Sequence, residues 1–100
     1  MEKFEQGDQV QIQCDIGPGA FPTEFLVTFE TVDGPISGFV RRENVVRSDK
    51  GDVGFISGTV EEVTDDVITV LVRGSFFTTT GIATLKRDWA NKHVQVARAA

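Results

Sequence analysis

The segment EFLVTFETVDGPISGFV, residues 24–40, holds two stretches of alternating side chains on either side of an Asp-Gly pair. In the first stretch Phe25, Val27 and Phe29 fall on one face, and Leu26 falls on the other. Alternation with a period of two is what a β-strand with one buried face produces. An Asp-Gly pair between two such stretches is a strong signal for a tight hairpin turn. We therefore predict an antiparallel hairpin here, and with it an all-β protein.

The same alternation recurs before and after this hairpin. The alternating apolar positions are Val10, Ile12 and Cys14 in one segment, and Ile68, Val70 and Val72 in another. Two prolines and two glycines in residues 17–22 predict a loop, because proline cannot donate a hydrogen bond to a ladder. The pattern predicts about seven strands, near residues 9–15, 25–32, 36–42, 55–63, 67–73, 76–86 and 93–98. Only one or two short helical turns are expected, at residues 42–46 and at residues 88–93, the second with Asp88 as its N-cap.

A chain of 100 residues is expected to form a single domain, residues 1–100. An Ile-Ser-Gly-x-Val sequence occurs twice, once on each side of a polar connection at residues 48–54. This repetition leaves a second arrangement open, in which similar halves span residues 5–47 and 53–98.

Three sequence features, in their order along the chain, resemble the small Src-homology-type (SH3-like) β-barrels. They are GDQVQIQ at residues 7–13, the Gly/Pro loop at residues 17–22, and DGPISGFVRRENV at residues 33–45. In those barrels a long loop follows the first strand and a short turn precedes the last. The resemblance covers residues 7–47 and, less closely, residues 53–98, and it implies an SH3-like barrel or a two-half barrel or sandwich. It does not imply proline-peptide binding, because the chain has no tyrosine and only one tryptophan.

Composition and charge narrow the classes of function. Hydrophobic residues make up 40% and charged residues 25% of the chain, as in ordinary globular proteins. The net charge of -5 repels phosphate at long range, so nucleic acid is disfavoured as a partner. One cysteine permits no intrachain disulfide, and no apolar run approaches the roughly 20 residues of a membrane helix. We expect a cytoplasmic protein without membrane contact.

The titratable residues predict no catalytic site. His93 is the only histidine, and no G-x-S-x-G sequence accompanies it. Cys14 shares a face with apolar residues and has Asp15 beside it, whereas a reactive thiol needs a cationic neighbour. We expect a protein that is not an enzyme, with an exposed histidine and a buried cysteine.

Metal and cofactor sites are not expected either. One His and one Cys cannot build a zinc site. Glu61 and Glu62 are predicted to face opposite sides of a strand, and Asp65 and Asp66 lie at a turn. No Gly-rich phosphate-binding motif occurs.

Several apolar residues also lie on the faces of predicted strands that should point toward solvent. Phe76 and Phe77 are adjacent, so in a strand they point to opposite faces. Such outward apolar residues can be covered by packing within the chain or by an interface with another protein molecule. The predicted protein interface consists of Phe21, Leu26, Leu71, Phe76 and Phe77. We expect a non-enzymatic binding or accessory module that acts through protein contacts, with itself as a homodimer or larger assembly, or with another protein.

Two alternatives stay open. Basic and aromatic residues alternate in two segments, and if these meet in space they can stack bases and bind a nucleic-acid backbone. The residues of this predicted nucleic-acid face are Phe39, Arg41, Arg42, Lys86, Arg87 and Trp89. The other alternative is a barrel that binds a small ligand in its interior.

Overall fold

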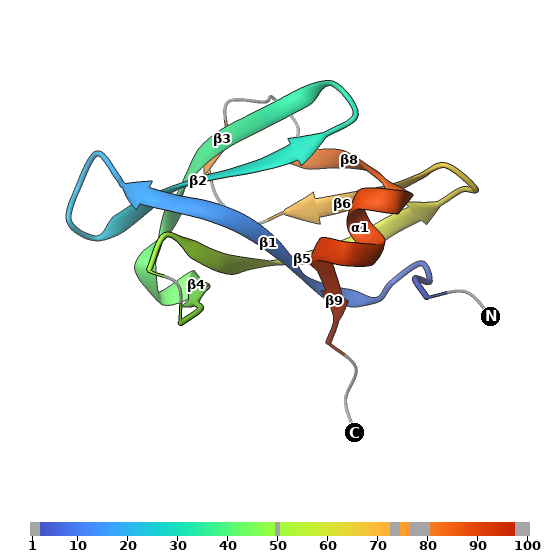
Figure 1. Ribbon diagram of the computed structural model, residues 1–100, viewed down its shortest axis with the longest axis horizontal. Coiled ribbons are helices and arrows are strands. Elements are labelled where there is room, and N and C mark those ends of the chain that lie inside the picture. The colour runs from blue at the N-terminus through green and yellow to red at the C-terminus, as the bar shows by residue number, and fades with distance from the viewer. Residues whose placement is uncertain (1–2, 50, 73–74, 77–80, 98–100) are drawn as a thin grey trace.

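The computed structural model describes residues 3–49, 51–72, 75–76 and 81–97 (Figure 1). The protein is all-β, with one short helix, and its antiparallel strands form one curled sheet. The strands are β1 (Gln9–Pro18), β2 (Glu24–Thr31), β3 (Gly34–Arg41), β4 (Val45–Arg47), β5 (Val53–Val63), β6 (Val67–Val72), β7 (Ser75–Phe76), β8 (Ile82–Lys86) and β9 (Val94–Val96). A 3-10 turn, η1 (Arg42–Asn44), follows β3, and the helix α1 (Arg87–His93) precedes β9.

Strand β1 lies in the middle of the sheet and pairs with β2, β5 and β9. The sheet order is β7-β3-β2-β1-β5-β6-β8, with β4 paired to β5. The backbone N–H of Val32, in the β2–β3 turn, donates a hydrogen bond to the carbonyl of Thr84 in β8 at 3.0 Å. This contact joins β8, at one end of the sheet order, to the β2–β3 hairpin near the other end, so the sheet curls into a small barrel.

The predicted hairpin is present, and it sets the register of the sheet. Strands β2 and β3 pair from Glu24 with Arg41 to Thr31 with Gly34. Gly34 has φ +103°, a left-handed conformation that glycine adopts without strain. The all-β class is confirmed.

Three details of the predicted boundaries were wrong. The chain predicted as one strand at residues 76–86 is divided between β7, which pairs with β3, and β8, which pairs with β6. Strand β1 continues to Pro18, two residues into the predicted loop, because proline is tolerated at a strand end. The N-cap of α1 is Lys86 and not Asp88, and no side-chain hydrogen bond caps the helix.

The core lies between the curled faces of the sheet, and the predicted alternation is confirmed there. Its buried apolar residues are Phe4, Val10, Ile12, Cys14, Phe25, Val27, Phe29, Val40, Val45, Ile56, Val60, Ile68, Val70, Val72, Ala83, Leu85, Ala90 and Val94. No buried polar or charged residue occurs in the described ranges.

A β-bulge interrupts the alternation in β5. Val60 pairs with Val70, but the next pair is Glu62 with Thr69, which leaves Glu61 as an extra residue. A bulge of this kind moves the following side chain to the other face. Glu61 and Glu62 are consequently both exposed, and the prediction that they face opposite sides was wrong. The bulge keeps a carboxylate out of the core.

Candidate functional site

The loop between β1 and β2 meets the end of β3 and the η1 turn at one end of the barrel, on the left in Figure 1. The backbone N–H of Arg42 donates to the carbonyl of Thr23 at 3.0 Å, which holds the turn against the loop. Within the loop, the N–H of Glu24 donates to the carbonyl of Phe21 at 3.1 Å. We call the side chains gathered here the loop-end surface: Phe21, Phe25, Arg41, Arg42 and Arg47.

Phe21 is the most exposed large apolar side chain of the described residues, at 66%. With Pro22, Arg41 and Arg42 it lines a hollow of about 700 Å³. Arg41 lies 3.6 Å from the carboxylate of Glu43, and both side chains are largely exposed, so this ion pair contributes little. The hollow therefore combines an exposed aromatic ring with two guanidinium groups and the carboxylates of Glu24 and Glu43.

A second hollow, of about 320 Å³, adjoins the first and shares Arg42 with it. The Arg42 guanidinium carbon lies 4.3 Å from the centroid of the Phe25 ring, and that of Arg47 lies 5.5 Å from the same centroid. Both distances are within the range of a cation–π interaction. Arg47 Nη2 also donates to the carbonyl of Gly51 at 2.9 Å. Phe25 thus belongs to the core and also supports two arginines at the surface.

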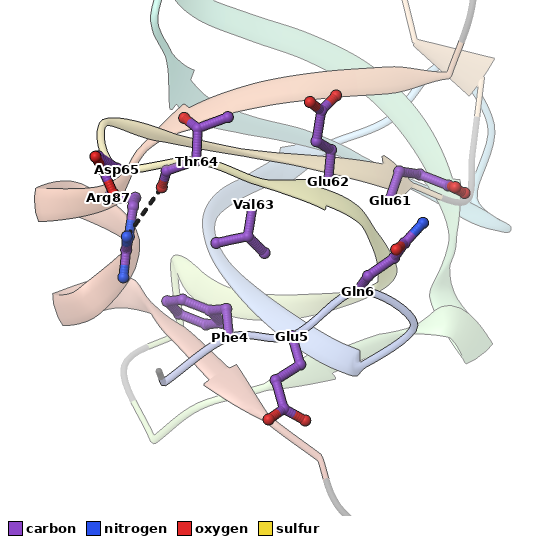
Figure 2. Close-up of a pocket in the computed structure, with 9 residues that line it drawn as sticks. All are labelled: Phe4, Glu5, Gln6, Glu61, Glu62, Val63, Thr64, Asp65 and Arg87. Carbon is purple, nitrogen blue, oxygen red and sulfur yellow. Dashed lines mark hydrogen bonds between the residues drawn. The ribbon is translucent and has the colours of Figure 1, made fainter. Parts of the chain in front are cut away.

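The opposite end of the barrel carries an acidic cleft of about 650 Å³ (Figure 2). Its carboxylates come from Glu5, Glu61, Glu62 and Asp65. Figure 2 shows Phe4 and Val63 near the middle of the cleft and the carboxylates around its outside.

Among the described residues, Arg87 is the one basic residue that lines the acidic cleft, and its Nη1 donates to the carbonyl of Thr64 at 2.9 Å (Figure 2). This bond ties α1 to the β5–β6 turn. No group of three or more His, Cys, Asp or Glu side chains is placed to hold a metal ion among the residues that the structure describes. The acidic cleft can attract a cation by charge, but nothing in it fixes one.

The residues considered for catalysis, Cys14 and His93, line one hollow of about 180 Å³ together with Asp15 and Trp89. His93 is half-buried rather than exposed as predicted, and it stacks on Trp89 with ring centroids 4.7 Å apart. Its Nδ1 lies 2.9 Å from the carbonyl of Trp89. Burial, and to a lesser extent the charge of Asp15, raises the pKa of the Cys14 thiol to about 12. Cys14 Sγ donates to the carbonyl of Gly54 at 3.5 Å, so the prediction of a buried cysteine is confirmed.

The predicted protein interface lies on more than one surface. Phe21 lies at the loop end, whereas Leu71 in β6 pairs with Ile82 in β8, and both of these are more than 40% exposed. Leu26 is half-buried in β2. The backbone of Phe76 pairs with Gly38, but its side chain and the whole of Phe77 lie outside what the structure describes.

The predicted nucleic-acid face is divided between the two ends of the hairpin. Arg41 pairs with Glu24 at the first residue of β2, whereas Lys86 and Trp89 line a small hollow with Thr31 at its last residue. Seven residue steps at about 3.3 Å separate these ends by roughly 23 Å. Arg42 lines the same hollow as Arg41. Arg87 lies at the acidic cleft, and Phe39 is half-buried in β3.

Sequence reasoning missed the contact of Phe25 with Arg42 and Arg47. It placed Phe25 in the core alone and left Arg47 out of both predicted faces. The contact joins side chains from β2, η1 and β4, and β4 is a strand that the sequence did not predict.

Comparison with family models, curated proteins and solved structures found no match to this chain. In the described part of the chain, no helix has the length and apolar character needed to span a membrane.

Proposed function

We propose that this protein is a non-enzymatic binding module that holds a segment of a partner protein at the loop-end surface. The observation that carries the proposal is Phe21, which is 66% exposed at the edge of a hollow that it shares with Arg41 and Arg42. Aromatic residues, phenylalanine included, and arginine are enriched in protein interfaces relative to the rest of the protein surface.

The backbone supports this role. Hydrogen bonds within the loop and between Arg42 and Thr23 give the loop-end surface a defined shape before any partner binds. A preformed site loses less conformational entropy on binding than a flexible one. The two adjoining hollows together offer an extended partner segment room for more than one side chain.

Self-association is a second candidate function, favoured by Leu71 and Ile82. These two exposed apolar side chains are directly paired on neighbouring strands, so they form one outward apolar site. Light scattering after size exclusion tests this role. A dimer that Leu71→Ser converts to a monomer supports it, and a wild-type monomer at high micromolar concentration contradicts it.

The main proposal is tested by selecting random peptides displayed on phage against the immobilised protein. We expect enriched peptides that lose at least tenfold in affinity for Phe21→Ser. Val32→Ser is the matched control, because it removes an exposed apolar side chain in the β2–β3 turn, at the far end of β2 from Phe21, and should leave affinity unchanged.

Two results would contradict the proposal. One is a selection without enrichment. The other is a set of lysine- and arginine-rich peptides that bind Phe21→Ser as tightly as the wild type, which would place binding at the acidic cleft. A fluorescent single-stranded oligonucleotide that binds the wild type and not Arg41→Gln would favour the nucleic-acid alternative instead.

A further inference from the structure

We propose that Arg42 and Arg47, whose guanidinium groups lie over the Phe25 ring, form a carboxylate-binding subsite that takes an acidic side chain of the partner segment. This inference rests on the proposed function and adds the chemical class of the group that is recognised.

Phe25 limits where the two guanidinium groups lie, because both are within cation–π distance of its ring. Each guanidinium group carries five N–H donors, and the Phe25 ring offers no oxygen or nitrogen acceptor for them. Arg47 also donates one hydrogen bond to the carbonyl of Gly51, which further limits the motion of the Arg47 side chain. Charged, bidentate hydrogen bonds to a carboxylate are the strongest that such donors make.

The charges around Phe25 are not neutralised within the described residues. Arg42 and Arg47 are the two charged residues that line this hollow, and in the described ranges neither forms an ion pair. The two guanidinium carbons lie within about 10 Å of each other, since both are measured from one ring centroid. An anion bound in the hollow that both arginines line would be attracted by both positive charges.

The other residues of the hollow fit a carboxylate on an aliphatic stem. Ile16, Pro18 and Phe25 contribute apolar surface, which suits the methylene groups of a glutamate side chain. A phosphate or a nucleic-acid backbone brings more negative charge and no such stem. The net charge of -5 opposes a polyanion more strongly than it opposes a single carboxylate.

The direct test is a titration followed by NMR of the Arg42 and Arg47 side-chain Nε–Hε signals, with glutarate as the carboxylate probe and inorganic phosphate as the comparison. We expect saturable shifts with glutarate at millimolar concentration, and loss of this binding in Arg42→Gln and Arg47→Gln. Lys86→Gln is the control, because it removes one exposed positive charge beside Thr31, at the far end of β2, and should leave glutarate binding unchanged. Phosphate binding without glutarate binding, or no saturable shift with either probe, would overturn the assignment.

A second measurement separates this inference from the proposed function. Among the displayed peptides that depend on Phe21, we expect an acidic residue whose change to glutamine weakens binding about tenfold in the wild type and not in Arg42→Gln/Arg47→Gln. If the double variant binds the selected peptides within twofold of the wild type, the carboxylate subsite is wrong while the binding function stands. If glutarate binds but no peptide depends on Phe21, the binding function fails and the subsite remains.

Discussion

Two glycines in the β1–β2 region differ in what an added methyl group would meet. A Cβ at Gly19 would lie 2.6 Å from the carbonyl oxygen of Glu24, whereas a Cβ at Gly17 would meet nothing within 4 Å. We expect Gly19→Ala to destabilise the protein by about 1–3 kcal/mol, the usual cost of overpacking, and Gly17→Ala to be close to neutral. In a domain of this size each kcal/mol lowers the melting temperature by roughly 4–8 °C. Equal melting temperatures for the two variants would show that the loop does not pack as described.

The buried thiol of Cys14 makes stability depend on pH. Its pKa is raised from 9.0 to about 12 in the folded protein. Between these values the unfolded chain has lost the thiol proton and the folded chain has kept it, so the free energy of unfolding falls as the pH rises. This contribution is fully present below pH 9 and is lost progressively up to pH 12. We expect the free energy of unfolding, measured with urea, to fall by about 1 kcal/mol more between pH 7.5 and 10 in the wild type than in Cys14→Ala. An identical pH dependence would mean that the thiol titrates normally.

At the scale of one strand, the two faces of β6 should respond very differently to the same substitution. Ile68 is fully buried, whereas Leu71 is 44% exposed. We expect Ile68→Ala to lower the free energy of unfolding by about 2–5 kcal/mol and Leu71→Ala to lower it by about 1 kcal/mol or less. Urea unfolding of both variants measures this. A large loss for Leu71→Ala would mean that another surface covers this face of β6, as in a dimer.

The elements also show what the sequence could and could not predict. The β2–β3 hairpin and the inward faces of β1, β2 and β6 follow from local alternation, because burial on one face requires a period of two. The bulge at Glu61 could not be predicted, since it depends on how β5 and β6 stay in register past Val60. The division of the predicted strand at residues 76–86 likewise results from pairing with two different strands, β3 and β6.

At the scale of the molecule, the site is harder to predict than the fold because it is assembled from distant parts of the chain. Phe21 and Phe25 flank the start of β2, Arg42 lies in η1, and Arg47 ends β4. Only the curled sheet brings these elements to one end, with the acidic cleft at the other (Figure 1). The same sheet separates Arg41 from Trp89, which the nucleic-acid alternative required to meet on one face.

The net charge of the protein and the local charge of Arg42 and Arg47 have opposite signs. We therefore expect salt to change the affinity for an acidic peptide only slightly. The net charge of -5 repels an acidic peptide at long range, whereas Arg42 and Arg47 attract its carboxylate at short range. Salt at 0.1 M screens interactions beyond roughly 10 Å, so it weakens the repulsion together with part of the attraction. We expect the affinity of a selected acidic peptide to change by less than about threefold between 50 and 200 mM salt, measured by isothermal titration calorimetry. A protein that makes six to ten phosphate contacts loses about 10³–10⁵ over the same range. A loss of that size with an oligonucleotide ligand, and no measurable peptide binding, would identify the loop-end surface as a nucleic-acid site.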